Sequence, residues 1–228
     1  KKHDVSGLFL FMRNKRVACR DVPFNYVGIV GRATYGYKSK YLAEFNFGMN
    51  GFEQFAKGKR FGFFPSASAG WVLSEEDFIK NISAINFLKI RASYGQVGND
   101  KMGGKRFLYI PSWVERGGKV TQDFVHNPDV TWEVANKFNL GLETRFLYGF
   151  EYDLDVFYEK RNSILIESTA IPELISGQSE PAFTNIGIMN NRGFETKLGY
   201  TKKFNKDVRL GANLSVAFAR NQVEFIDE

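Results

Sequence analysis

The chain has 228 residues, which is enough for one large β-sheet domain or for one piece of a larger protein. Its 23 Phe, 10 Tyr and 22 Gly, set against only 6 Pro, favour many β-strands joined by turns. The net charge of +6 is interleaved with 25 acidic residues, and the chain has one cysteine and two histidines, which argues against nucleic-acid binding, an internal disulfide and structural zinc.

The first half of the chain shows alternating apolar and polar residues in several segments. Residues 7–12 are predicted to form a strand and polar residues 13–25 a loop. A hairpin follows, with a tight turn at residues 39–40. Apolar side chains of both its strands share one face: Val27, Ile29, Ala33, Tyr35, Tyr37, Tyr41, Ala43, Phe45, Phe47 and Met49.

A strand–helix–strand unit is predicted after a basic loop at residues 52–62. Alternating residues predict strands over 65–73 and 88–94. Between them, the sequence Ser74-Glu75-Glu76-Asp77 matches a capping box, in which Ser74 accepts a backbone hydrogen bond and Asp77 reaches back. A short helix is therefore expected from Ser74 to about Ile82.

The second half begins with a long polar segment, residues 99–129, which has no clear periodicity. Strands are then predicted over 138–146 and 150–159, with a tight turn at residues 148–149. After a loop at about 164–185, strands are predicted over 194–201 and 208–218, joined by a turn at 205–207.

Short and long connections alternate along the chain, and the predicted helix takes a short-side position. The apolar face also carries aromatic residues beside the short turns, namely Tyr37, Tyr41, Phe146, Phe150, Tyr200 and Phe204. Outer-membrane barrels have short turns at one rim, long loops at the other and aromatic girdles at both interfaces. No run of 18 apolar residues predicts a membrane helix, so any crossing would be made by strands. The patterning favours an all-β, antiparallel, up-and-down transmembrane β-barrel segment over a soluble β-sandwich, which also has one wet face.

Several short sequence motifs follow one another in a particular order along nearly the whole chain. They are GRATYGYK (31–38), FPSASAGW (64–71), LKIRASYG (88–95) with GN (98–99), TWE (131–133) before NLGLE (139–143), DVFYEK (155–160), and NIG (185–187) before NRGFE (191–195). In these motifs and in their order, the chain resembles the C-terminal half of the barrel of SusC/RagA-like TonB-linked outer-membrane transporters.

The resemblance implies a barrel of about 22 strands. It also implies an N-terminal plug domain, coupling to the TonB complex, and a SusD-like surface lipoprotein that delivers oligosaccharides, glycans or peptides. The expected location is the outer membrane of a Gram-negative, Bacteroidetes-like cell, where lipid contacts the strands. Residues 1–228 are expected to be one partial outer-membrane β-barrel domain, without the plug domain or a terminal strand ending in an aromatic residue. A siderophore receptor would share the mechanism and differ in cargo, and a soluble carbohydrate-binding module is the alternative outside transport.

Catalysis is not predicted, and neither is a cofactor or metal. Asp153 and Asp155 share a face only because strand residues i and i+2 always do, and residues 103–105 lack full Walker spacing. If the resemblance holds, ligand chemistry belongs to the lumen and the external loops. The residues expected to contact substrate or a partner are Arg106, Tyr109, Trp113 and Arg116, with loop packing as the alternative explanation. Lys57, Lys59 and Arg60 are expected to meet anionic lipopolysaccharide or solvent.

Overall fold

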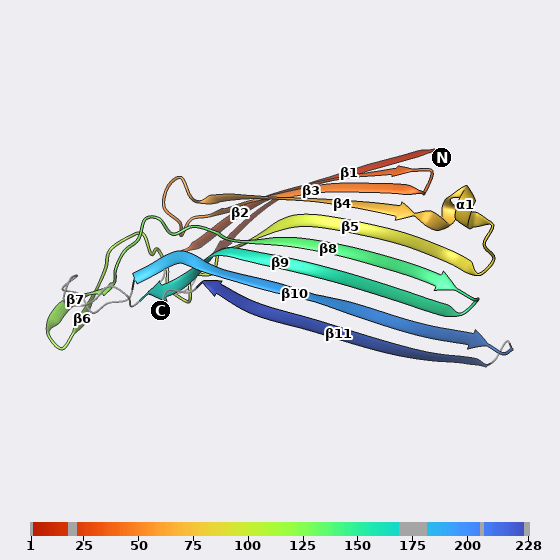
Figure 1. The fold of residues 1–228 in the computed structure, drawn as a ribbon. Coiled ribbons are helices and arrows are strands. Elements are labelled where there is room, and N and C mark those ends of the chain that lie inside the picture. The colour runs from red at the N-terminus through yellow and green to blue at the C-terminus, as the bar shows by residue number, and fades with distance from the viewer. Residues whose placement is uncertain (1, 18–21, 169–181, 206–207, 226–228) are drawn as a thin grey trace.

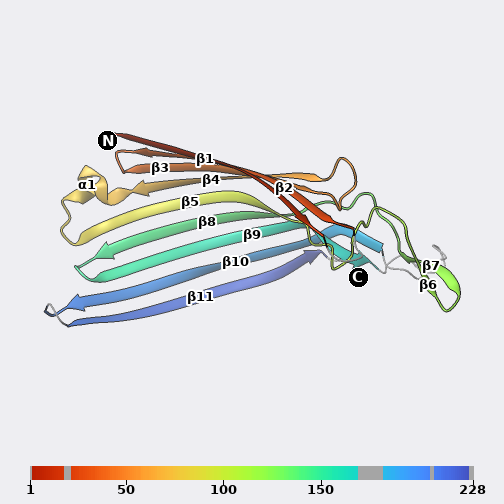
Figure 2. The ribbon, with the colours of Figure 1, turned by 180° about the vertical axis from the view of Figure 1, so that it is seen from behind.

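The computed structural model describes residues 2–17, 22–168, 182–205 and 208–225, with the side chains of residues 116 and 121 excepted. Nine strands form a single antiparallel sheet in which every strand pairs with its neighbours in chain order, and β6 and β7 form a separate hairpin. Figures 1 and 2 show the sheet as a long, twisted wall from both sides. The all-β, up-and-down prediction is confirmed. A β-sandwich divides its strands between two packed sheets, whereas here nine of the described strands lie in one sheet and only β6 and β7 lie outside it, so the β-sandwich alternative is wrong.

The strands are long, and two short helical turns lie between β4 and β5. The elements are β1 (His3–Arg16), β2 (Phe24–Tyr37), β3 (Tyr41–Phe52), β4 (Phe61–Val72), the 3-10 turn η1 (Leu73–Glu75), α1 (Asp77–Lys80), β5 (Ile85–Asn99), β6 (Ser112–Arg116), β7 (Lys119–Phe124), β8 (Glu133–Phe146), β9 (Phe150–Ser168), β10 (Ala182–Lys203) and β11 (Arg209–Phe225). Among the described residues, no helix has the length and apolar character needed to cross a membrane.

Three predicted loops are shorter than expected. Strands β1 and β2 are paired as far as Arg16 and Phe24, so the loop predicted at 13–25 begins only after Arg16. Strands β9 and β10 are paired as far as Ser168 and Ala182, so the loop predicted from 164 also begins late. Within the segment 99–129, the hairpin β6–β7 was not predicted. In none of these segments do apolar and polar residues alternate clearly: residues 13–16 are all polar, and residues 164–166 are all apolar. The backbone ladder continues there although the period-two signal is lost. Residues 18–21, 169–181 and 206–207 of the predicted loops lie outside the described residues.

The predicted capping box is wrong. The helix is a single turn that begins after Glu76, and its N-cap makes no side-chain capping bond. The Glu76 carboxylate instead accepts hydrogen bonds from Tyr41 Oη at 2.7 Å, Trp71 Nε1 at 3.1 Å and Lys40 Nζ at 3.1 Å. These bonds hold the pKa of Glu76 below its usual value, with Tyr41 contributing most, then Trp71, then Lys40. The helical connection is thereby fastened to the neighbouring β2–β3 turn.

The predicted separation of short and long connections is confirmed. The turns at residues 38–40 and 147–149, the helical connection and the β10–β11 turn all lie at one end of the sheet, and the long loops with β6–β7 lie at the other (Figure 1). We call these the short-turn end and the long-loop end. This arrangement is that of an up-and-down meander whose two rims face different surroundings.

The two faces of the sheet differ as the alternation predicts. One directly paired row crosses eight strands with Tyr35, Ala43, Ala69, Ala92, Leu140, Val156, Phe194 and Phe218, after Val5 of β1. We call this side the apolar face. The adjacent row, on the side we call the polar face, contains Ser6, Thr34, Glu44, Ser68, Ser93 and Asn139. An exposed apolar face of this extent indicates a surface that contacts lipid or another protein.

Aromatic residues border the apolar face at the short-turn end. Rings of directly paired residues stack side by side: Tyr37 on Tyr41 at 6.4 Å, Tyr41 on Trp71 at 6.3 Å, and Phe146 on Phe150 at 5.4 Å. Tyr200 continues the second row, 4.4 Å from Phe150. The predicted aromatic girdle is therefore present at this end. On β9 the apolar face then continues from Phe150 to Tyr158, nine residues, which matches the length of a membrane-crossing strand.

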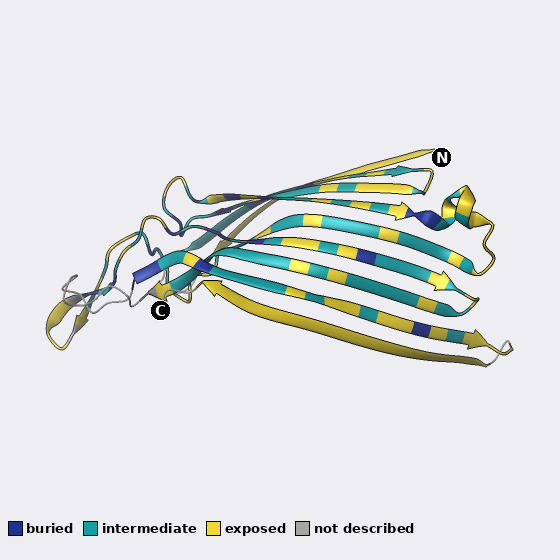
Figure 3. Cartoon of the chain, in the orientation of Figure 1, coloured by how far each residue is buried: buried dark blue, intermediate teal, exposed yellow. Residues whose placement is uncertain are grey.

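The buried core lies at the long-loop end and is made mostly of loop residues. Its buried members are Phe55, Phe64, Met102, Leu108, Phe124, Val130, Trp132 and Phe183. Trp132 is central, with ring centroids 5.3 Å from Phe55 and 5.4 Å from Phe64. Figure 3 shows buried residues gathered toward this end, while β11 is exposed along its whole length. We call this cluster the loop core. It shows that the long loops are packed against one another as a folded platform.

Candidate functional site

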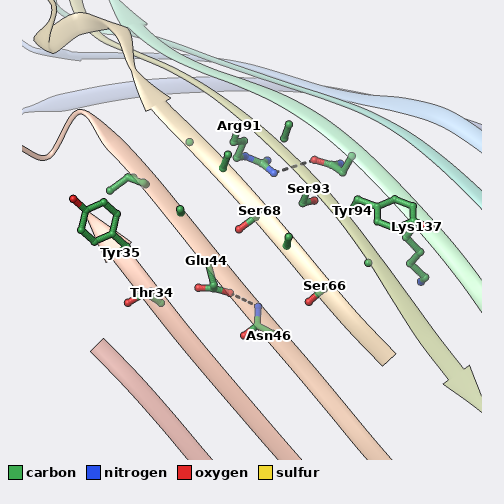
Figure 4. A pocket seen from close by; sticks show the side chains of 18 of the residues that line it. Thr34, Tyr35, Glu44, Asn46, Ser66, Ser68, Arg91, Ser93, Tyr94 and Lys137 are labelled. Atoms are coloured by element: carbon green, nitrogen blue, oxygen red, sulfur yellow. Dashed lines mark hydrogen bonds between the residues drawn. The ribbon is translucent and has the colours of Figure 1, made fainter. Parts of the chain in front are cut away.

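A furrow runs along the polar face where side chains are small. Its floor is made by Ser66, Ser68 and Gly70 of β4 together with Ser93 and Gly95 of β5. Figure 4 shows Ser66, Ser68 and Ser93 between Glu44 and Asn46 of β3 on one side and Arg91 of β5 and Lys137 of β8 on the other. The volume of the furrow is about 720 Å³. Because alternate strand residues point to one face, the serines spaced two apart in the sequence all open into the same furrow.

Arg91 of β5 forms the centre of one wall. Its Nε donates to Glu143 Oε1 at 3.0 Å, its Nη1 donates to Asn139 Oδ1 at 3.1 Å, and its Nη2 donates to both carboxylate oxygens of Asp155 at 2.7 and 2.8 Å. Gly141, directly opposite, makes this reach possible, because a Cβ there would lie 2.7 Å from the guanidinium carbon. The guanidinium is thus fixed across three strands, β5, β8 and β9.

The opposite wall carries a carboxylate and an amide. Asn46 Nδ2 donates to Glu44 Oε1 at 2.7 Å, and Asn46 Oδ1 accepts from Arg32 Nε at 2.8 Å. Toward the long-loop end, Lys137 is paired with Glu159 at 3.2 Å. Hydroxyl groups on the floor and held polar groups on the walls can hydrogen-bond sugar hydroxyls or peptide groups. Among the described residues, no group of three His, Cys, Asp or Glu could hold a metal ion.

Two of the four predicted contact residues lie at the base of the long loop. The Arg106 guanidinium lies 3.8 Å from the ring centroid of Phe24, and its Nη2 donates to the carbonyl oxygen of Val22 at 2.8 Å. Tyr109 is half-buried, and its hydroxyl accepts from Arg60 Nη2 at 3.4 Å. Both side chains contact other loops, so each contributes to the packing of the platform.

The other two predicted residues lie on the hairpin. Trp113 is on β6 and is 62% exposed. Arg116 ends β6, and its side chain is outside the described residues. None of Arg106, Tyr109 and Trp113 lines the furrow, and the role of all four residues in binding remains a prediction. Of the basic residues in the 53–60 loop, Lys59 is paired with Asp129 at 2.6 Å and Arg60 Nε donates to the Phe55 carbonyl oxygen at 3.1 Å.

The furrow was not predicted from the sequence. Its signal was present in the alternation of Ser66, Ser68 and Gly70, which we interpreted only as the polar side of a strand. What sequence patterning lacks is the register that sets Ser93 and Gly95 beside them. A furrow forms only where small residues on two neighbouring strands lie beside each other. The register between the strands decides this, and the sequence pattern of each strand does not contain it.

The combination of features defines a class of protein. A long antiparallel meander with one lipid-like apolar face, an aromatic border, one polar face and rims of unequal loop length is the wall of an outer-membrane β-barrel. Residues 21–227 match the family described as TonB dependent receptor-like, beta-barrel. The chain belongs to this family.

Relatives of known name agree with this assignment. The chain is 30% identical over 217 residues to TonB-dependent receptor P26 of Formosa agariphila, covering 90% of this chain and 22% of that protein. It is 27% identical over 209 residues to TonB-dependent receptor SusC of Bacteroides thetaiotaomicron, covering 86% of this chain and 20% of SusC. The chain thus spans about a fifth of the length of these curated relatives.

Solved structures show the same fold. The RagAB peptide importer in its open-open state superposes with a TM-score of 0.78 at 22% identity, over 90% of this chain and 22% of that chain. The siderophore receptor PirA from Pseudomonas aeruginosa gives a TM-score of 0.58 at 12% identity, over 89% of this chain and 36% of that chain. The SusC/RagA resemblance is therefore confirmed at the level of family and fold.

Proposed function

We propose that this chain forms part of the barrel wall of a TonB-dependent outer-membrane importer that takes up oligosaccharides or peptides together with a SusD-like lipoprotein. The observation that carries the proposal is the contrast between the two faces. The apolar face suits lipid, and the polar face suits a solvated path with the furrow along it. The family assignment and the SusC relative support TonB dependence.

The polar face is consistent with an uncharged or zwitterionic cargo. Arg91 is neutralised by Glu143 and Asp155, and Lys137 by Glu159, so the furrow presents mainly hydrogen-bonding groups. Sugar hydroxyls and peptide amides both suit such a surface. The peptide importer RagAB matches more closely in fold than the siderophore receptor PirA, which favours organic nutrients over iron chelates.

A deletion experiment tests the proposed function. Loss of the gene that encodes this chain is expected to abolish growth on oligosaccharides or peptides as sole carbon source, while growth on monosaccharides or amino acids is unchanged. The full-length protein should be found in the detergent-soluble, heat-modifiable outer-membrane fraction. A growth defect confined to iron-limited medium would instead identify a siderophore receptor.

Replacing Trp113 by alanine tests the predicted role of the hairpin in ligand or partner contact. Because Trp113 is exposed on β6, the change should leave the fold intact and reduce uptake at limiting substrate about tenfold, equivalent to about 1.4 kcal/mol. Tyr148→Ala is the matched control, since Tyr148 is 82% exposed at the short-turn end. Uptake unchanged in both variants would rule out the role of Trp113. The roles proposed for Arg106, Tyr109 and Arg116 would then lose their main support.

A further inference from the structure

On β10 and β11 the apolar face ends, toward the long-loop end, at a pair of charged residues. On β8, β9, β10 and β11, the residues of this face between the aromatic border and the row of Phe138 and Tyr158 include no Asp, Glu, Lys or Arg. The first charges toward the long-loop end are Arg192, directly paired with Tyr158, and Arg220, directly paired with Arg192. Two arginines therefore stand together where the apolar face ends.

The position of Arg192 and Arg220 along the strands can be related to a neighbouring pair of aromatic rings. Phe194 and Phe218, two residues nearer the short-turn end on the same strands, stack at 6.0 Å. Because side chains two apart point to the same face, Arg192 and Arg220 extend directly beyond these rings. A pair of apolar rings followed directly, on the long-loop side, by a pair of charged side chains is the pattern expected where the hydrocarbon layer meets polar headgroups.

Like charges directly opposite each other destabilise a sheet unless something neutralises them. Within the described part of the chain, neither Arg192 nor Arg220 has an ion pair. Glu224, four residues beyond Arg220 on β11, is already paired with Lys160 at 3.0 Å and accepts a hydrogen bond from Asn190. Among the described residues, the arginine pair therefore presents two positive charges without a carboxylate partner at this boundary.

We propose that Arg192 and Arg220 together bind the phosphate of an anionic glycolipid headgroup in the outer leaflet. The proposal rests on the proposed function, which places the long-loop end outside. Two guanidinium groups present planar sets of N–H donors that match phosphate oxygens, and their fixed pairing on β10 and β11 removes the cost of bringing them together. The acyl chains of the same lipid would then lie along Phe194, Phe218 and the apolar face below them.

The test uses the full-length protein purified in detergent and native mass spectrometry to measure bound lipid. The variant is Arg192→Gln/Arg220→Gln. The matched control is Lys203→Gln/Arg209→Gln, which removes another directly opposed cationic pair from the same two strands, but from the polar face at the short-turn end. Three probes are added separately: a phosphorylated glycolipid of the lipid A type, the same glycolipid without phosphate, and phosphatidylglycerol. Heat-modifiable migration checks that both variants fold.

The wild type and the control should retain the phosphorylated glycolipid, and Arg192→Gln/Arg220→Gln should retain about tenfold less. Removing the phosphate from the probe should lower wild-type retention to the level of the variant. Equal retention by wild type and variant, or retention that does not depend on phosphate, would overturn the proposal. Retention of phosphatidylglycerol equal to that of the glycolipid would also overturn it, because the site would then be a general one for lipid phosphates. Location and uptake are measured separately, so failure of the importer assignment would be seen in fractionation and growth and not in this assay.

Discussion

Replacing Trp132 by alanine is expected to speed hydrogen exchange of the backbone amides in residues 100–131 by a hundredfold or more. Trp132 is buried, and its ring meets three phenylalanines, Phe52, Phe55 and Phe64, at centroid distances of 6.5, 5.3 and 5.4 Å. Removing a buried aromatic side chain costs about 3–5 kcal/mol, and each 1.4 kcal/mol is a factor of ten. The loss falls on the loop core, so the loops should open while the strands stay paired.

Hydrogen-exchange mass spectrometry of the full-length protein resolves the two regions. Trp71→Ala is the control, because it removes the same residue type from the aromatic border of the apolar face. That variant should leave exchange in residues 100–131 unchanged. If Trp132→Ala left these amides as protected as in the wild type, the loop core would not hold the platform together.

The sequence alone was enough to predict the sheet, but it was not enough to predict how the long loops pack into the platform. Alternation within residues 138–158 is strong because one side of each strand is apolar and the other charged, and the structure pairs these strands as predicted. The loop core has no such period. Phe55, Leu108 and Phe183 lie more than 50 residues apart in turn, and each is buried only because the folded wall brings their loops together. Long-range packing of this kind leaves no local pattern to read.

The errors within the predicted elements have local physical causes. The Ser74–Asp77 sequence satisfies the capping pattern, but Glu76 is drawn to Tyr41, Trp71 and Lys40 on neighbouring elements, so tertiary hydrogen bonds override the local cap. The hairpin β6–β7 turns at Gly117-Gly118, both with positive φ, and this turn signal was overlooked inside a polar segment. The four predicted contact residues were chosen by type alone, and type does not distinguish Arg106, which packs on Phe24, from the exposed Trp113.

The polar face and the loop core meet at Phe64. This residue lies on β4, two residues beyond Ser66 of the furrow floor toward the long-loop end, and its ring packs on Trp132. Two glycines leave room for the ring: a Cβ at Gly62 would lie 2.4 Å from Phe64 Cζ, and a Cβ at Gly98 only 1.9 Å from it. The closeness of these approaches means that neither position accepts a side chain while Phe64 stays in place.

Gly98→Ala is therefore expected to destabilise the loop core by about 1–3 kcal/mol, the usual cost of overpacking. The new methyl group must displace the Phe64 ring, which packs against Trp132. The readout is again hydrogen exchange in residues 100–131, where the change corresponds to an increase of about fivefold to 150-fold.

Gly48→Ala provides the matched control for this change, because it also adds one methyl group to a glycine within a strand. No atom lies within 4 Å of the added Cβ at Gly48, so the change should be neutral or should stabilise by up to about 1 kcal/mol. A double-mutant cycle isolates the contact with the ring. A Phe64→Ala background removes the three atoms nearest to the added methyl group, and Gly98→Ala should then cost little or nothing. If the cost of Gly98→Ala were the same with and without Phe64, the strain would lie in the β5 backbone and the proposed packing of Phe64 over the two glycines would be wrong.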